Sequence, residues 1–359
     1  MTITKVEIKN YKALEHVSFG CDMINLITGK NSSGKTSLLE AIFTANDVQS
    51  GDYFLRHLGW RGQRFIRSDA RSLFGPMFHN QDLDKLIQIT LLEKGLEVDR
   101  FNWEISFKKN LSIENVPSQI TNGVIQTKHD GSSGARSGEG LETKFSKNGE
   151  IITTLKSVLA GNAIQSSVTG KILPRKRVTY CSQSVMNPQE DLERFSDLDK
   201  AGKMDSIYSD LRLIEPKLTR LATYTLANGD SGLYAHVNGL GQAVPVGQLG
   251  AGFVRLLSTI MTIRGNEKSV VLIDEMENGF HYSVYPKIWG IVSSAIYESK
   301  SQAFISSHSL EFIQGMKETN HLGQSKLLRI ANSKDGTRRI TEFSGQELMQ
   351  AIESDMDLR

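Results

Sequence analysis

A single loop, Gly29 to Thr36, constrains the fold of this chain more than any other segment. It contains Gly-Lys-Asn-Ser-Ser-Gly-Lys-Thr and matches the pattern G-x-x-x-x-G-K-[ST]. The apolar run 23–28 before it predicts a strand, and apolar residues recur at helical spacing between Leu38 and Phe43 after it. The glycines let backbone N–H groups turn inward around phosphate oxygens, and the helix directs the positive end of its dipole at them. The segment therefore predicts a phosphate-binding loop in an α/β fold.

Two side chains of this loop have predicted roles in binding ATP and Mg²⁺. Lys35 is expected to contact the β- and γ-phosphates, and the Thr36 hydroxyl is expected to ligate the metal ion. We expect ATP to contact the whole loop and the first turn of the helix, through Gly29, Lys30, Asn31, Ser32, Ser33, Gly34, Lys35, Thr36 and Ser37.

A second segment, Val270 to Glu275, places two acids directly after four apolar residues. This pattern is typical of a buried parallel strand whose carboxyl end presents carboxylates to a ligand. Asp274 is expected to hold Mg²⁺, directly or through water, and Glu275 to orient and polarise the attacking water. Two such acids can also simply mark where a chain leaves the core, but the loop at Gly29 favours the functional interpretation.

Four features, in chain order, resemble those of ABC-type ATPases. They are the loop described above, Gln248 to Gly252, Ile273 to Glu275, and Ser306 to Ser309. Within that superfamily, the stretch Ile273 to Ser283 looks like the branch that includes OLD-family ATPase domains and ATPases of bacterial antiphage operons. The resemblance covers about 1–45 and 190–359 and is thin across 46–185.

The resemblance implies roles for further residues. Gly250, Ala251 and Gly252 correspond to the signature motif, which in this superfamily contacts the γ-phosphate of ATP held by the opposite subunit. Gly250 stands where a serine usually donates a hydroxyl, so only backbone donors are expected there. His308 is expected to be the switch histidine that senses the γ-phosphate. Gln183 could be the Mg²⁺-linked glutamine, although a surface glutamine fits the sequence equally well.

The expected fold is α/β, a P-loop NTPase of ABC type with an antiparallel β subdomain and an inserted helical lobe. Three segments follow from this expectation: 1–185 and 249–359 as the two parts of the ATPase core, and 186–248 as a helical lobe with a hairpin. Further elements are predicted from periodicity and turn residues. They are antiparallel strands within 86–108 that turn at Gly95, a polar and mobile surface excursion over 110–149, a helix over 204–214, a hairpin turning at Asn228-Gly229, a helix over 253–263, a strand over 303–306, and a hairpin over 327–343.

Composition places few further limits on function. The net charge is +2, with 39% hydrophobic and 23% charged residues, which is ordinary for a globular protein. This charge neither favours nor excludes nucleic-acid binding. Two cysteines, Cys21 and Cys181, match no disulfide framework or metal-ligand spacing. The sequence shows neither a signal peptide nor an apolar run of about 18 to 20 residues. A cytoplasmic protein without membrane segments is therefore expected.

Basic residues cluster in two places, Arg56 to Arg71 and Lys171 to Arg177. The first cluster is a candidate nucleic-acid contact; it consists of Arg56, Arg61, Arg64, Arg67 and Arg71, with Trp60 and Phe65 among them. If this stretch is helical, its last three arginines share one face that suits phosphates. Arginines on a helix are as commonly a solvated face or partners of nearby acids.

The leading hypothesis for function is an ATPase of a bacterial antiphage defence system. ATP binding would join two copies of the chain, as a homodimer or a higher homo-oligomer, and hydrolysis by Glu275 would separate them. About fifty residues follow His308, and they contain no run of acids of the kind that a metal-dependent nuclease needs. This stretch is also too short for the toprim domain of OLD nucleases. A separate effector, expected to be a nuclease, would then carry the toxic activity.

Three alternatives remain open. A RecF-like DNA repair ATPase would clamp DNA along the Arg56 to Arg71 stretch. A nucleotide-binding subunit of a membrane transporter is disfavoured by the departure at Gly250. A scaffold that binds ATP without turnover is disfavoured by the intact Glu275.

Overall fold

The chain was analysed as a computed structural model. The structure describes residues 2–47, 53–60, 69–113, 119–121, 124–126, 136–160, 163–173, 175–181, 188–225, 229–333, 336–354 and 356–359. Contacts between residues divide the chain into two compact units: unit 1 contains 1–22, 27–178 and 328–342, and unit 2 contains 23–26, 179–327 and 343–359. The three-segment organisation expected from the sequence stays a prediction. In the described part of the chain, no helix is long and apolar enough to span a bilayer.

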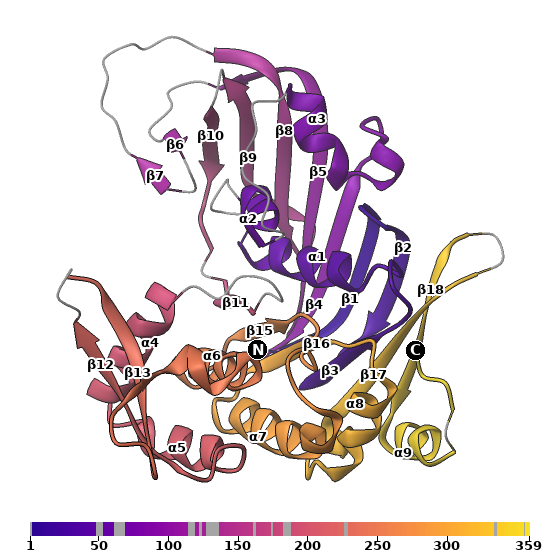
Figure 1. Ribbon diagram of the computed structural model, residues 1–359. Helices are drawn as coiled ribbons and strands as arrows, with labels where there is room; N and C mark the ends of the chain where they lie inside the picture. Colours follow the sequence, from indigo (N-terminus) through magenta and orange to yellow (C-terminus); the bar gives the residue numbers. More distant parts are fainter. Residues whose placement is uncertain are drawn as a thin grey trace. The chain divides into compact units, whose positions relative to one another are not determined.

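A nine-stranded sheet forms most of unit 1 (Figure 1). Its strand order is β2-β1-β4-β5-β8-β9-β10-β6-β7, and each neighbouring pair is antiparallel. The strands are β1 (Thr2–Tyr11), β2 (Leu14–Gly20), β4 (Ile87–Lys94), β5 (Val98–Ile113), β6 (Gln119–Thr121), β7 (Val124–Gln126), β8 (Arg136–Lys147), β9 (Glu150–Ala160) and β10 (Ala163–Gly170). The predicted β4–β5 pair is confirmed, with Gly95 in the turn between the strands.

Strand β8 corrects the prediction that 110–149 is a surface excursion. It pairs with β5 on one side and β9 on the other. A Cβ added to Gly140 would lie 2.1 Å from the carbonyl oxygen of Ser157, so this strand needs a glycine where the neighbouring backbone comes close. Gly138 and Gly140 of this stretch therefore belong to the sheet. Residues 114–118, 122–123 and 127–135 of this stretch lie outside the described residues.

Three helices accompany this sheet: α1 (Lys35–Asp47), α2 (Tyr53–Trp60) and α3 (Ala70–Phe74). Helix α1 is buried along most of its length and contacts β1, β4 and α2. Phe43 of α1 meets Trp60 of α2 edge to face, with ring centroids 4.4 Å apart. This packing fixes the helix that begins directly at the Gly29 to Thr36 loop.

The larger part of a six-stranded sheet lies in unit 2. Its order is β11-β15-β16-β3-β17-β18. The strands are β11 (Val178–Cys181), β15 (Val270–Ile273), β16 (Gln302–Ser306), β3 (Ile24–Thr28), β17 (Ser325–Asn332) and β18 (Arg338–Ser344), and the division between the units falls within β3, β11, β17 and β18. Strands β15 and β16 are parallel, with Ile273 opposite Ile305. Every residue of both strands is buried, as predicted for β15 from its apolar sequence.

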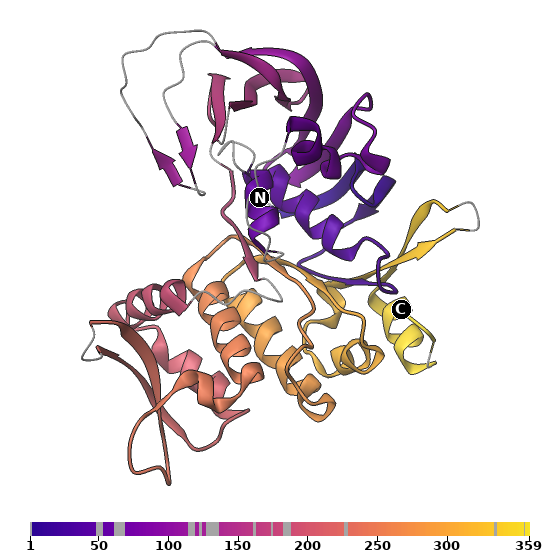
Figure 2. The same cartoon turned by 45° about the horizontal axis from the view of Figure 1, so that its top comes forward.

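Helices α6 (Ala251–Gly265) and α7 (Tyr285–Glu298) lie beside each other in unit 2 (Figure 1, Figure 2). Their apolar residues form one core with those of β15 and β16. The same core includes side chains from α4 (Pro188–Lys200), α5 (Met204–Arg212), α8 (Leu310–Gly315) and α9 (Gly345–Glu353). The predicted helices at 204–214 and 253–263 are confirmed as α5 and α6.

A three-stranded sheet of β12 (Leu218–Thr225), β13 (Ser231–Val237) and β14 (Val244–Pro245) completes unit 2. Strands β12 and β13 form the predicted hairpin, although Asn228 lies outside the described residues. Short 3-10 turns lie at Gly75–Met77, His79–Gln81, Val246–Leu249, Tyr282–Val284, Met316–Glu318 and Leu322–Gln324.

Candidate active site

The Gly29 to Thr36 loop has the backbone of a phosphate cradle. Gly29 and Gly34 adopt φ values of 148° and 109°, which favour glycine. A Cβ on Gly29 would lie 2.5 Å from the carbonyl oxygen of Ile330, and one on Gly34 would lie 2.9 Å from Leu14 Cδ2. Side chains at these positions would therefore force the loop open. The loop follows β3 directly and leads into α1, as predicted.

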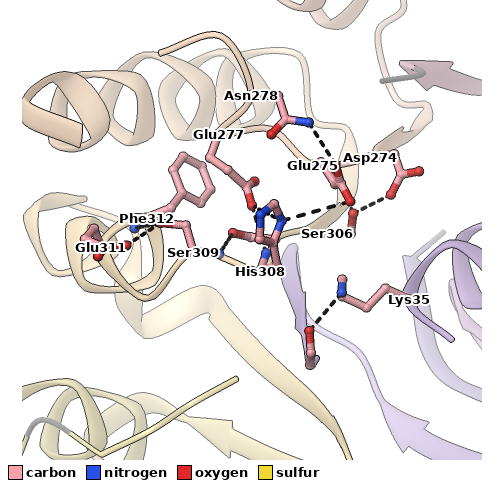
Figure 3. A network of polar contacts seen from close by, with 12 residues as sticks. Lys35, Asp274, Glu275, Glu277, Asn278, Ser306, His308, Ser309, Glu311 and Phe312 are labelled. Carbon is pink, nitrogen blue, oxygen red and sulfur yellow. Dashed lines mark hydrogen bonds and ion pairs between the residues drawn. The ribbon is translucent and has the colours of Figure 1, made fainter. Parts of the chain in front are cut away.

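The side chains of the loop fit a triphosphate. Lys35 is 7% exposed, and its Nζ donates to the carbonyl oxygens of Gly29 at 2.8 Å and Lys30 at 3.2 Å (Figure 3). The Ser33 hydroxyl is buried and has no hydrogen-bond partner among the described residues. Thr36 is half-buried at the start of α1. Phosphate oxygens would give the Ser33 hydroxyl a hydrogen-bond partner. They would also replace the carbonyl oxygens of Gly29 and Lys30 as acceptors for Lys35.

A residue that sequence reasoning missed supports the loop from the side. Lys12 lies in the turn between β1 and β2, and its Nζ forms a 2.8 Å ion pair with Oε2 of Glu40, which is buried in α1. A Cβ on Gly34 would approach Ala13, the next residue of the same turn, to 3.6 Å. No local pattern marks Lys12, because its partner is 28 residues away in the sequence.

In unit 2, two hydroxyl groups hold the carboxylate of Asp274 at the end of β15. Ser306 Oγ donates to Oδ1 at 2.5 Å, and the Tyr180 hydroxyl donates to Oδ2 at 3.0 Å. Ser306 ends β16, and Tyr180 belongs to β11, so three strands of one sheet converge on this acid. A metal ion could also bind to the Asp274 carboxylate through water molecules.

Glu275 is held in an unusual conformation beside Asp274. Its φ is 49°, in the left-handed region that few side chains adopt. Its backbone N–H donates to Ser306 Oγ at 2.8 Å, and Asn278 Nδ2 donates to its carboxylate at 2.8 Å. Arg255 of α6 donates to the carbonyl oxygens of both Asp274 and Glu275. Such a strained backbone persists where its surroundings determine it strongly, a situation common at active sites.

His308 completes the cluster of polar side chains (Figure 3). Its Nδ1 lies 3.0 Å from Glu277 Oε1 and 4.0 Å from Glu275 Oε1. Its side chain is 43% exposed, so the ring reaches both the buried acid and solvent. Unit 2 thus brings together Asp274, Glu275 and His308, while the phosphate loop belongs to unit 1.

The predicted signature segment forms the start of α6. Gly250 precedes the helix with φ 97° and ψ 153°, a conformation that a serine would adopt only with strain. A Cβ on Gly252 would lie 2.4 Å from the carbonyl oxygen of Gly279. The absence of the serine at Gly250 therefore has a backbone cause. Gly252 packs directly on the loop that contains Asn278 and Gly279.

The expected basic patch is only partly described. Arg61, Arg64 and Arg67, together with Phe65, lie outside the described residues, as does Gln183. Arg56 of α2 forms a 2.9 Å ion pair with Asp47, and Arg71 of α3 forms a 3.0 Å ion pair with Glu139. For these two arginines the structure supports the alternative that they are partners of nearby acids.

The second basic cluster includes a buried arginine. Arg175 forms a 2.5 Å ion pair with Glu93, and the two side chains are 8% and 2% exposed. Its guanidinium lies over the rings of Phe101 and Trp103, at 4.2 Å and 5.2 Å from their centroids. Burial lowers the pKa of Arg175, which the charge of Glu93 opposes. Arg175 therefore stabilises the sheet of unit 1.

Mg²⁺ needs only a small number of protein ligands. Among the described residues, no group of three or more His, Cys, Asp or Glu side chains could hold a metal ion. Mg²⁺ commonly takes one or two protein ligands and completes its shell with phosphates and water. Thr36 in unit 1 and Asp274 in unit 2 each carry an oxygen that could ligate such an ion.

Comparisons with known proteins agree with this geometry. Residues 1–116 match a family described as an AAA ATPase domain, and residues 150–314 match one described as "AAA domain, putative AbiEii toxin, Type IV TA system". An ATP/GTP phosphatase of Helicobacter pylori is 23% identical over 353 residues, which cover 90% of this chain and 91% of that protein. The chain is a P-loop ATPase.

Two further similarities concern the fold and a short segment of this ATPase. An SMC head bound to the C-terminal winged-helix domain of ScpA is 14% identical, with a TM-score of 0.50 over 96% of this chain and 99% of that chain. The predicted ABC-type fold is thereby confirmed. A DNA replication and repair protein RecF of Bacillus mycoides is 46% identical over 44 residues, 12% of each protein.

Proposed function

We propose that this ATPase binds ATP with the phosphate loop and that Glu275 activates the water for hydrolysis. The arrangement around Glu275 carries the proposal, because Ser306 and Arg255 hold its left-handed backbone and Asn278 donates to its partly exposed carboxylate. An acid needed only for folding would not require this restraint. Glu275 would accept a hydrogen bond from the water that attacks the γ-phosphate.

Each other residue has a distinct role in this proposal. The loop amides and Lys35 bind the phosphates, and Thr36 and Asp274 would hold Mg²⁺, which withdraws charge from the phosphate oxygens when bound. Tyr180 and Ser306 keep the Asp274 carboxylate oriented. His308 contacts the γ-phosphate and thereby distinguishes ATP from ADP.

We propose further that two copies of the chain share each ATP. The first residues of α6, Gly250 to Gly252, would donate backbone N–H groups to the γ-phosphate bound by the opposite copy. Helix α6 has no acidic residue in its first turn, so nothing there opposes an incoming phosphate. Association of the two copies would then depend on ATP, and hydrolysis would release them.

The test is the mass of the Glu275→Gln protein in solution with ATP and Mg²⁺. Glutamine retains the shape of the side chain and the hydrogen bond to Asn278, but it cannot take up a proton from water. We expect a dimer or a larger assembly with ATP and a smaller species with ADP, measured by light scattering after size exclusion. Lys35→Ala is the matched control and should not assemble with either nucleotide. A Glu275→Gln protein that hydrolyses ATP at the parental rate would overturn the role of Glu275.

In the cell, we propose that the ATPase cycle regulates a separate effector in antiphage defence, with a nuclease as the expected effector. The family matched by residues 150–314 carries the description of a putative toxin of a toxin–antitoxin system, which supports this class of function. The test is co-expression with proteins encoded by adjacent genes. A neighbour that is toxic only with the ATPase, and differently so with Glu275→Gln, supports the proposal; no such neighbour would contradict it.

A RecF-like role in DNA repair is the second candidate, favoured by the match to RecF over 44 residues. In this case ATP-bound dimers should bind duplex DNA, and the affinity should fall steeply between 50 and 200 mM salt. Substitution of Arg61, Arg64 and Arg67 by Ser should then weaken binding. DNA binding that is absent with ATP at low salt would exclude this candidate.

A further inference from the structure

Glu277 is a buried carboxylate without a role in the hydrolysis steps described above. It lies in the turn after β15, and its side chain is 4% exposed. One oxygen, Oε2, is buried and has no hydrogen-bond partner among the described residues. A buried carboxylate with an unpaired oxygen costs stability, on the order of 1 to 3 kcal/mol or more for a charged group. This cost suggests that the charge serves a purpose other than folding.

The other oxygen of Glu277 accepts a hydrogen bond from the His308 backbone and lies at ion-pair distance from the His308 ring. The backbone N–H of His308 donates to Oε1 at 2.8 Å, and the ring nitrogen Nδ1 lies 3.0 Å from the same oxygen. An ionised carboxylate only accepts, so a hydrogen bond along this contact would need the proton on Nδ1. Such a bond would fix the orientation of the ring and leave Nε2 to face a ligand.

The surroundings keep this pair together. Glu275 Oε1 lies 4.0 Å from the same ring nitrogen, Nδ1. Burial raises the pKa of the neighbouring Tyr285 phenol, and the charge of Glu277 raises it further, so this phenol remains neutral next to the acid. Burial lowers the pKa of Arg255, and the acids Asp274, Glu277 and Glu275 oppose that shift. Arg255 thus supplies positive charge on the buried side of the cluster.

We propose that Glu277 is the positioning residue of His308. It holds the imidazole through a proton on Nδ1 and orients Nε2 toward the γ-phosphate; Nε2 takes up a proton from solvent when that phosphate binds and then donates to it. The proposal rests on the proposed function, because it assigns His308 a contact with that phosphate. A carboxylate that selects a histidine tautomer through Nδ1 is a known means of preparing the opposite nitrogen for chemistry.

The first experiment measures the tautomer and needs no activity. Nitrogen-15 NMR of histidine-labelled protein without nucleotide should show His308 with a protonated Nδ1, its signal assigned by loss in His308→Ala. Glu277→Leu should shift His308 to a tautomer mixture. Glu277→Gln retains an acceptor oxygen and the side-chain volume, so it should keep the Nδ1–H form. It is the control in case the leucine variant misfolds. A parent protein with His308 protonated only at Nε2 would overturn the proposal.

The second experiment is a double-mutant cycle on ATP hydrolysis. Glu277→Leu should lower kcat by about 10- to 100-fold with little change in KM, the range found for groups that orient a functional histidine. In the His308→Ala background the same substitution should change kcat less than about 2-fold, because its effect passes through His308. Glu318→Gln, an exposed glutamate of the same unit, is the matched control.

The outcomes separate the two proposals. If the effects of Glu277→Leu and His308→Ala multiply independently, Glu277 does not act through His308, and the inference fails while hydrolysis stands. If the parent hydrolyses no ATP, the proposed function fails, and the NMR result still decides whether Glu277 sets the tautomer.

Discussion

Removal of the Arg175 guanidinium should destabilise unit 1 far more than removal of an exposed arginine. Arg175→Met keeps the aliphatic stem but leaves Glu93, which is 2% exposed, without its ion-pair partner. An uncompensated buried charge costs about 3 to 5 kcal/mol. Loss of the contacts with Phe101 and Trp103 adds about 0.5 to 2 kcal/mol. We expect a loss of about 4 kcal/mol in the free energy of unfolding.

Arg71→Met is the matched control, because Arg71 forms a similar 3.0 Å ion pair with Glu139 but is 54% exposed. Its loss should cost about 0 to 1 kcal/mol. The double variant Glu93→Gln/Arg175→Met should recover part of the stability, since neither charge then remains buried. Urea unfolding measures these differences, and hydrogen exchange of peptides from β4 and β5 localises them to unit 1. An Arg175→Met protein within 1 kcal/mol of Arg71→Met would refute the argument.

Three further predictions concern single residues. Lys35→Ala should weaken binding of a fluorescent ATP analogue by at least about 10-fold, because a charge-assisted contact is lost, whereas the exposed Lys317→Ala should bind as the parent does. Gly250→Ala should lower stability by about 1 to 3 kcal/mol in thermal unfolding, since the φ of Gly250 is 97°. Gly247→Ala should have little effect, because an added Cβ there meets nothing within 4 Å. Equal losses in the two variants would contradict the reasoning. The hydrogen bond from the Ser72 side chain, aided by backbone N–H groups, holds the pKa of Asp69 below its usual value of 3.8. The folded state therefore binds this proton less readily than the unfolded chain does. The stability that Asp69 contributes is present above about pH 4 and is lost as pH falls through the folded pKa. Asp69→Asn should lack this part of the acid dependence when unfolding is measured from pH 5 to 2.

Much of the core could be predicted from local sequence because its elements carry their own signals. Strand β15 is apolar throughout, β16 is apolar from Ala303 to Ile305, and the loop at Gly29 has a spacing that few other structures require. Strand β8 could not be predicted in this way. Its serines and glycines are typical of a loop, and only the close approach of Ser157 explains why Gly140 belongs in a sheet.

The supporting residues of the site escaped prediction for a different reason. Tyr180 and Asp274 are 94 positions apart in the sequence, and His308 and Glu277 are 31 apart. No periodicity links such pairs, and their roles depend on hydrogen bonds that exist only after folding. The strained φ of Glu275 is likewise invisible in a sequence where the residue simply follows an aspartate.

The central claim is that one ATP is bound by the phosphate loop of one copy and by Gly250 to Gly252 of another. ATP turnover in a mixture of two inactive proteins tests it most directly. Lys35→Ala lacks a working phosphate loop, and Gly252→Asp places a charge where α6 would meet phosphate. A mixed dimer would contain one intact site, formed by the loop of the second protein and the α6 of the first. We predict that mixing restores a substantial fraction of parental turnover; a mixture as inactive as its components would contradict the account.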